Sequence, residues 1–153
     1  KEVTNLLLKN KKNIAVAESC TGGLISHTLT NVSGSSKYFK LGLVLYSNQM
    51  KSKILNIDPK DISHFGAVSE KTAKLLAQKV KKLAKTDIGL SATGIAGPAG
   101  GSKKNPIGTV YIALTYRNFT FVRKFKFNGT RIQIKNKTKN KALLLIKRCL
   151  KNQ

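Results

Sequence analysis

The residues best suited to chemistry lie in the segment 18–23, which reads Glu-Ser-Cys-Thr-Gly-Gly and follows a short apolar run. The hydroxyls of Ser19 and Thr21 and the thiol of Cys20 come just before a predicted helix. Free N–H groups and the helix dipole favour an anion or an oxyanion at such a place. Ser19 is a candidate nucleophile if a base takes its proton, and Cys20 is a second one, because helix N-termini activate thiols. The simpler interpretations are that Ser19 or Thr21 caps the helix and that Cys20 is a small buried residue.

A second segment, 92–101, carries four glycines and also follows a predicted strand. Glycine lets backbone N–H groups approach a ligand without side-chain obstruction, so this segment suits a phosphate or another anion. Its spacing matches neither the dinucleotide-binding glycine pattern nor the Walker loop. The candidate ligand-binding residues here are Thr93, Gly94, Gly97 and Gly100.

A base is needed to activate the nucleophile, and histidine is the usual one. The chain has only His27 and His64, and neither has the spacing of a triad with Ser19. Lysine is the alternative, provided that its ordinary pKa of about 10.4 is lowered. Lys51 lies one turn into a predicted helix after Tyr46, where partial burial and the positive surroundings would lower that pKa. A solvated surface lysine is the simpler interpretation.

One arginine stands at the start of the last predicted helix. Arg131 follows an Asn-Gly pair, and its planar guanidinium makes bidentate contacts to phosphate or carboxylate. It is therefore either an anion-binding residue or an ordinary surface arginine.

Periodic apolar residues predict the elements that position these segments. The expected helices are 2–12, 22–29, 48–55, 69–83 and 130–149, and the expected strands are 14–17, 39–46, 88–92, 108–115 and 119–127. The last two strands form a hairpin, and His64 falls in a loop. Alternating strands and helices predict an α/β fold, a three-layer α/β/α sandwich with a mixed sheet, in one domain over residues 1–153. The two candidate segments would then line a pocket at the carboxyl edge of the sheet.

The large excess of basic over acidic residues indicates which kinds of molecule this chain could bind. The chain has 29 basic and 6 acidic residues, a net charge of +23, and no acidic residue from position 88 onward. Such a charge attracts polyanions in a salt-dependent way. The basic residues are mostly lysine, spread along the chain and not interleaved with aromatic residues, and no nucleic-acid-binding motif occurs. Nucleic acid is therefore expected only as a non-specific electrostatic partner.

The number of cysteines and the length of the apolar runs indicate the cellular compartment in which we expect this chain. Two cysteines predict neither a disulfide framework nor a zinc site, so we expect no metal and a reducing cytoplasm. No apolar run approaches the roughly 20 residues needed to span a bilayer.

Five segments, taken in order, resemble one known family. They are 17–23, then Tyr-Ser-Asn at 46–48 with Lys51, then 66–69, then 93–101, then 108–110. This combination is similar to the CinA C-terminal domain family, the nicotinamide-nucleotide amidohydrolases, over nearly the whole chain from residue 13. The resemblance implies an α/β/α domain that deamidates nicotinamide mononucleotide to nicotinate mononucleotide and ammonia without a cofactor, and it favours a homodimer.

The resemblance also implies roles for residues. Its serine, lysine and tyrosine match Ser19, Lys51 and Tyr46. The substrate-binding positions that we expect from it and from the motifs are Glu18, Thr21, Gly22, Thr93, Gly94, Gly97, Gly100 and Arg131. Two positions depart from the family, which often has an acidic residue where Thr130 stands and a second arginine where Lys135 stands. Lysine cannot reproduce a bidentate contact, so phosphate binding is open to question.

Two other functions remain open. The first is a nucleic-acid-binding protein, supported by the +23 charge. The second is a nucleotide-binding module that keeps the pocket without the chemistry.

Overall fold

The sheet at the centre of the molecule is mixed. A computed structural model describes residues 1–151 and contains five strands in the order β2-β1-β3-β4-β5. Strand β1 pairs in parallel with both β2 and β3, whereas β4 runs antiparallel to β3 and to β5. The strands are β1 (Ile14–Glu18), β2 (Phe39–Val44), β3 (Ile88–Gly94), β4 (Thr109–Tyr116) and β5 (Phe119–Lys126).

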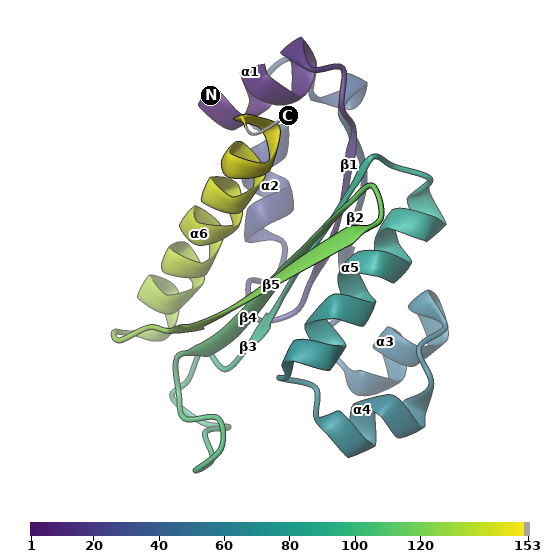
Figure 1. Ribbon diagram of the computed structural model, residues 1–153. Helices are drawn as coiled ribbons and strands as arrows, with labels where there is room; N and C mark the ends of the chain where they lie inside the picture. Colours follow the sequence, from purple (N-terminus) through teal and green to yellow (C-terminus); the bar gives the residue numbers. More distant parts are fainter. Residues whose placement is uncertain (152–153) are drawn as a thin grey trace.

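Helices cover both faces of this sheet (Figure 1). They are α1 (Glu2–Lys9), α2 (Leu24–Thr30), α3 (Asn48–Leu55), α4 (Pro59–Phe65), α5 (Glu70–Ala84) and α6 (Arg131–Lys151), with a 3-10 turn at Ser35–Lys37. Helices α1, α2 and α6 lie on one face, and α3, α4 and α5 lie on the other. The expected three-layer α/β/α sandwich with a mixed sheet is therefore confirmed.

The alternation of side chains along the central strand explains the two layers. In β1, Ile14 and Val16 pack in the core beneath α1, α2 and α6. Ala15 and Ala17 face the opposite layer. Small residues on that side let α5 approach the sheet closely, and a Cβ added to Gly89 would lie 2.1 Å from the carbonyl oxygen of Ala77. Every residue of β1 is buried, and its first four residues form one continuous apolar run that ends at Glu18.

The register brings the ends of three strands together. Glu18, the last residue of β1, pairs with Val44 on one side and Ala92 on the other. Strands β1, β2 and β3 are mutually parallel, so the segments that follow them emerge at one edge of the sheet. The first residue of α6 reaches this edge because β5 ends there, opposite Thr109.

Several expected boundaries were wrong by a few residues, and one residue was expected in the wrong kind of element. Helix α2 begins at Leu24 rather than at 22, because Gly22 and Gly23 have positive φ angles of 60° and 94°. Helix α1 ends at Lys9, and β2 ends at Val44. His64 lies within α4, not in a loop. None of the helices in the described part of the chain is both long and apolar enough to cross a membrane.

Candidate active site

Ser19 follows β1 at the carboxyl edge of the sheet. Its N–H donates to the carbonyl of Ala92 at 3.0 Å, and the neighbouring carbonyl of Glu18 accepts from the N–H of Leu45 at 2.7 Å. These two bonds extend the strand pairing to both sides of Ser19. The Ser19 hydroxyl is half-buried and makes no hydrogen bond with any of residues 1–151. The backbone of the candidate nucleophile is thus fixed while its oxygen is free to react.

Glu18 holds the segment that carries Ser19. Its carboxylate is 1% exposed and accepts four hydrogen bonds. The donors are the Thr21 hydroxyl at 2.6 Å, the Ile25 N–H at 3.0 Å, and the N–H and hydroxyl of Ser26 at 2.8 and 2.6 Å. Neither Ser19 nor Thr21 caps α2, and its N-cap residue Gly23 has no side chain. The carboxylate of Glu18 takes the place of a capping side chain, because it accepts from N–H groups in the first turn of the helix. Glu18 and Thr21, two of the expected substrate-binding residues, contact each other through their side chains.

The backbone of this segment offers more than one donor for an oxyanion, because the N–H groups of Cys20 and Gly23 have no partner among the described residues. The N–H of Gly22 already donates to the carbonyl of Ser19 at 3.1 Å. The N–H of Thr21 has no partner among the described residues. Gly22 lies beneath an ammonium group, since a Cβ added to it would be 3.4 Å from Nζ of Lys135. The absence of a side chain at Gly22 therefore lets the ammonium group of Lys135 come close to the backbone, while the N–H of Gly22 is already used in a hydrogen bond.

Lys51 is buried without a counter-ion. It lies one turn into α3, where Ser47 caps the helix by accepting from the N–H of Met50 at 3.2 Å. Its side chain is 2% exposed, and it forms no ion pair with residues 1–151. Burial lowers the pKa of Lys51, and the nearby thiol of Cys20 opposes this only in part. No hydrogen bond joins Lys51 to Ser19 directly.

Cys20 lies at the centre of the charged groups. Its side chain is 6% exposed, and burial, reinforced by the carboxylate of Glu18, raises the pKa of the thiol to about 12. Lys135 and Arg131 act on this thiol in the opposite direction, which places both cations near it. Side chains from α3, the β1–α2 segment and α6 therefore surround one point. The thiol itself remains protonated at neutral pH, unlike a catalytic cysteine.

Arg131 connects two of the segments at this edge. Its guanidinium donates to the carbonyl of Gly97 at 2.8 Å and to the hydroxyl of Tyr46 at 2.5 Å. Tyr46 is 61% exposed, so this contact fixes a side chain that is otherwise in solvent. The N-terminus of α6, the end of β2 and the glycine segment are thereby joined.

Close packing explains why two positions of the glycine segment are occupied by glycine. A Cβ added to Gly94 would lie 2.7 Å from the carbonyl oxygen of Thr109, and one added to Gly97 would lie 2.6 Å from Cγ2 of Ile107. Thr93 is 1% exposed and donates to the carbonyl of Ala67 at 2.8 Å. Packing and this hydrogen bond give Gly94 and Thr93 structural roles, and their contact with a ligand stays a prediction.

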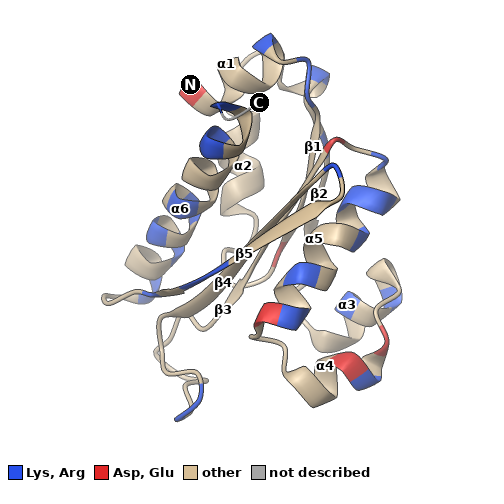
Figure 2. Cartoon of the chain, in the orientation of Figure 1, with Lys and Arg blue, Asp and Glu red and all other residues tan. Residues whose placement is uncertain are grey.

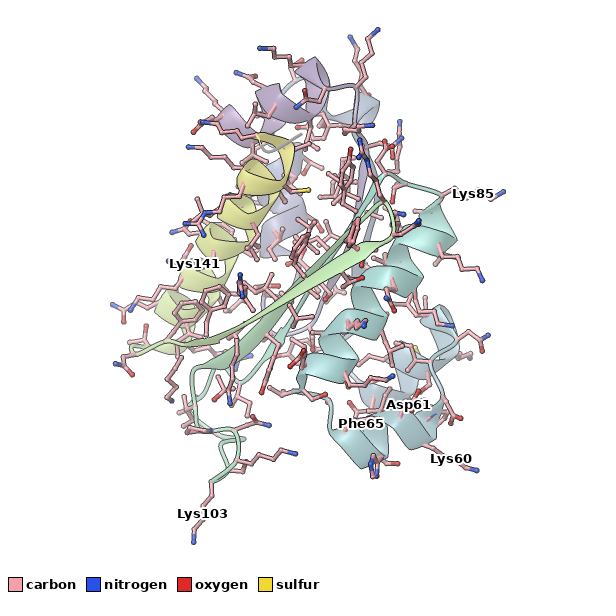
Figure 3. All side chains as sticks on the ribbon, in the orientation of Figure 1. Lys60, Asp61, Phe65, Lys85, Lys103 and Lys141 are labelled. Atoms are coloured by element: carbon pink, nitrogen blue, oxygen red, sulfur yellow. The ribbon has the colours of Figure 1, made fainter. Side chains whose placement is uncertain are left out.

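The remainder of that segment still presents backbone donors. The N–H groups of Gly97, Gly100 and Gly101 have no acceptor within residues 1–151. The segment projects away from the sheet, and Figure 3 shows Lys103 at its tip. Anion binding here would thus use the part after Gly97.

The two histidines lie apart from this constellation. His27 is exposed on α2, where its ring contacts the side chain of Asn31 at 3.1 Å. His64 packs edge-on against the ring of Phe65, with ring centres 4.6 Å apart. Neither contacts Ser19, so a serine–histidine pair is not formed.

Thr130 has a definite structural role. Its N–H donates to Oε1 of Gln133 at 2.8 Å, and its hydroxyl accepts from the Gln133 N–H at 3.3 Å. This is a capping box at the start of α6. Thr-x-x-Gln before a helix is the sequence signature of this box, so the signal was visible in the sequence, and Thr130 caps α6.

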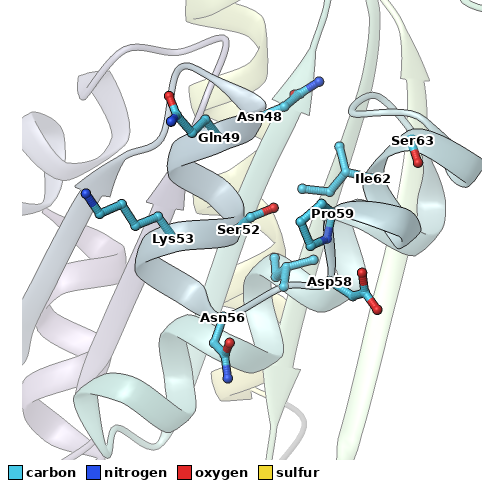
Figure 4. Close-up of a pocket in the computed structure, with 10 residues that line it drawn as sticks. Asn48, Gln49, Ser52, Lys53, Asn56, Asp58, Pro59, Ile62 and Ser63 are labelled. Carbon is cyan, nitrogen blue, oxygen red and sulfur yellow. The ribbon is translucent and has the colours of Figure 1, made fainter.

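A further hollow in the described structure lies elsewhere, between α3 and α4 (Figure 4). Its volume is about 630 Å³, and polar side chains such as Asn48, Gln49 and Ser52 line it. Its one carboxylate, Asp58, is engaged in capping α4 through the N–H of Lys60 at 2.9 Å. It contains no nucleophile paired with a base. Within residues 1–151, no group of three or more His, Cys, Asp or Glu side chains gathers as metal ligands would.

Known proteins are similar to this chain in sequence and in fold. The chain is 49% identical over 145 residues to a CinA-like protein of Endomicrobium trichonymphae, covering 95% of this chain and 34% of that protein. It is 47% identical over 149 residues to a CinA-like protein of Syntrophus aciditrophicus, covering 97% of this chain and 36% of that protein. The chain therefore spans about a third of the length of these curated relatives.

Solved structures of proteins that are similar in sequence have the same fold. A competence/damage inducible protein of Agrobacterium tumefaciens superimposes with a TM-score of 0.92 at 32% identity, covering 100% of this chain and 97% of that one. A CinA superfamily protein of Klebsiella pneumoniae gives a TM-score of 0.95 at 26% identity, covering 99% and 95%. The family model described as CinA C-terminal domain matches residues 1–150. The chain belongs to the CinA C-terminal domain family.

Proposed function

We propose that this chain is an amidase that hydrolyses the carboxamide of nicotinamide mononucleotide to nicotinate mononucleotide and ammonia. The observation that carries the proposal is Lys51, a lysine that is 2% exposed and has no ion-pair partner within residues 1–151. It lies at the same sheet edge as a serine whose hydroxyl has no other use. Isolated buried lysines are costly to a fold, so a chemical role is the natural explanation for this one.

The reaction proceeds through an acyl-enzyme. Neutral Lys51 takes the proton of Ser19, directly or through one water, as Ser19 Oγ attacks the amide carbon. The C–N bond then breaks, and the departing nitrogen receives the proton from Lys51 and leaves as ammonia. Water attacks the resulting ester and gives one proton to Lys51, which passes it to the departing Ser19 oxygen. The product leaves as the carboxylic acid, which ionises to the carboxylate, and its proton is taken up by the released ammonia. Atoms and protons balance over the cycle.

Two features would stabilise the charged species. The N–H of Thr21 supports an oxyanion, and such a donor is worth about 3–4 kcal/mol in related hydrolases. Arg131 and Lys135 stand over the same segment and would bind the phosphate, helped by the N–H groups after Gly97. The net charge of +23 would speed capture of the anionic nucleotide.

Serine is preferred over cysteine as the nucleophile for a physical reason. The thiolate is the reactive form of cysteine, and the buried Cys20 has a pKa of about 12. Ser19 is half-buried and needs only a neighbouring base, which a lysine of lowered pKa supplies.

The test is ammonia release from nicotinamide mononucleotide, without added metal, by the wild type and by Ser19→Ala. We expect turnover in the wild type and none in the variant. Ser63→Ala, an exposed serine on α4 that donates to the carbonyl of Lys60, is the matched control and should keep full activity. Full activity in Ser19→Ala would exclude the covalent serine scheme. Thermal stabilisation of the wild type by the nucleotide with no ammonia release would support a binding module instead.

We also propose the cytoplasm as the compartment and a homodimer as the assembly. Cys20 and Cys149 are both free thiols, as expected in a reducing compartment. Sedimentation velocity of the purified chain would measure the assembly.

A further inference from the structure

A groove with unusual composition lies between β5 and the second half of α6. Its volume is about 380 Å³. The lining is apolar in part, with Phe119, Phe121 and Leu145, and cationic in part, with Arg117, Arg123 and Arg148. It is remote from Ser19, because Tyr116 beside it pairs with Ile88, the first residue of β3, whereas Ser19 follows the last residue of β1. The groove and the candidate active site occupy opposite edges of the sheet.

Three aromatic residues line the groove, Tyr116, Phe119 and Phe121, and the two phenylalanine rings are exposed to solvent. Phe119 is 68% exposed and Phe121 is 57% exposed. Strand β5 is at the edge of the sheet, and residues two apart on it share a face, so Phe119, Phe121 and Arg123 stand in a row. A phenylalanine in this position has no structural purpose in the isolated chain, and adjacent exposed aromatics mark interaction surfaces.

Arginine is concentrated at this groove. Only four of the 29 basic residues of the chain are arginines, and three of those four line it. A general preference for lysine in the composition cannot account for this. Arginine differs from lysine in stacking on flat rings and in binding phosphate bidentately. The sequence-based view that basic and aromatic residues are not interleaved was therefore wrong for β5, where strand alternation brings them together.

The groove has no acidic counterpart. None of its three arginines forms an ion pair within residues 1–151. The three salt bridges found among those residues are all made by lysines. Figure 2 shows acidic residues near the N-terminus, in the loop before β3 and around α4 and the start of α5, and none on β5 or α6. A partner for this surface must therefore bring the negative charge. Two copies of the chain meeting here would oppose arginine with arginine.

We propose that this groove binds single-stranded nucleic acid. Unpaired bases stack on Phe119 and Phe121, and the three arginines contact the phosphates on either side. Exposed rings flanked by cations are how sequence-tolerant single-strand binders work, and a duplex, whose bases are already stacked, could not use the rings. An acidic protein would use the arginines but has no special need for the pair of rings.

The test is fluorescence anisotropy with a labelled oligothymidine of about a dozen nucleotides at about 100 mM salt. The stacking variant is Phe119→Ala with Phe121→Ala, and the charge variant is Arg123→Gln with Arg148→Gln. The matched control is Lys74→Gln with Lys82→Gln, which removes the same charge from exposed positions on α5, on the other face of the sheet. Thermal unfolding of each variant verifies its fold, and ammonia release should be unchanged in all of them.

We expect each groove variant to weaken binding about tenfold and the control to change it less than about twofold. The charge variant should also lower the slope of affinity against salt. Four outcomes would overturn the proposal: no binding by the wild type, equal loss in the control, equal affinity for the matching duplex, or full competition by free thymidine monophosphate. A wild-type dimer that becomes a monomer in the stacking variant would assign the face to a second copy instead.

Discussion

The guanidinium of Arg131 donates to the hydroxyl of Tyr46 at 2.5 Å, although 85 residues separate them. The same side chain donates to the carbonyl of Gly97 at 2.8 Å. One side chain at the start of α6 thus ties the end of β2 to the glycine segment. The resemblance alone gave Tyr46 a part in the chemistry, and this contact makes it a partner of Arg131, the arginine that we propose binds the phosphate.

Arg131→Lys is expected to raise the KM for nicotinamide mononucleotide about tenfold or more, with a smaller change in kcat. A lysine ammonium cannot contact Tyr46, Gly97 and a phosphate together, because it lacks the planar fork of donors. Steady-state ammonia release measures both constants. Arg117→Lys, at the opposite edge of the sheet, serves as the control. Equal effects of the two changes would mean that net charge, and not this contact, governs binding.

Tyr46→Phe distinguishes an anchoring tyrosine from a proton relay. If Tyr46 only orients Arg131, the loss of one exposed hydrogen bond should lower kcat/KM by about tenfold or less, mainly through KM. The same kinetic assay tests this. A fall in kcat of more than about a hundredfold would show instead that the phenol moves a proton.

Lys51→Met is expected to stabilise the fold at about pH 7, and this advantage should shrink as the pH rises to about 10. Burial holds the pKa of Lys51 in the folded chain below its ordinary value of 10.5. Between the folded and the unfolded pKa, the unfolded chain binds more protons, so the free energy of unfolding of the wild type rises with pH. Methionine has a similar length and does not titrate.

Urea unfolding of both chains at the two pH values measures this difference. Lys74→Met, at an exposed position of α5, should show no such dependence on pH. A constant difference between wild type and Lys51→Met across the range would mean that the pKa of Lys51 is not lowered. The variant should also lose turnover, by a factor of about 10²–10⁴ if Lys51 is the base.

Cys20→Ala is expected to keep most of the amidase activity. The thiol, with its pKa of about 12, is protonated at neutral pH and 6% exposed, so iodoacetamide should label it only after unfolding. Ammonia release and mass spectrometry of the labelled chain provide the two measurements. Loss of turnover in a folded Cys20→Ala chain would make the thiol, not Ser19, the nucleophile.

Glu18→Gln is expected to lower the free energy of unfolding by about 3 kcal/mol. Its buried carboxylate accepts from four donors, and a glutamine would turn an NH₂ group toward one pair of them. Urea unfolding checks the change. Glu70→Gln, exposed in the first turn of α5, should cost less than about 1 kcal/mol. If both changes cost the same, the carboxylate of Glu18 does not organise the segment that carries Ser19.

Local patterns were enough to predict most of the fold. The apolar run of β1, the helical spacing after Ser69 and the cap at that serine all depend on residues near one another in sequence, and the hydroxyl of Ser69 does accept from the N–H of Thr72 at 3.1 Å. The start of α2, by contrast, depends on the positive φ angles of Gly22 and Gly23, which the apolar pattern does not reveal.

Residue type and periodicity are local properties, so they were sufficient to predict the three-layer fold and the small set of residues proposed as nucleophile, base and anion-binding group. Tertiary folding then set which of these residues lie close together. It buried Lys51 without a counter-ion, turned Glu18 and Thr21 toward each other, and placed Arg131 between Tyr46 and Gly97. It also gathered the arginines and exposed rings of β5 and α6 into one groove. Burial and charge proximity depend on chain segments far apart in sequence, so no local pattern reveals them.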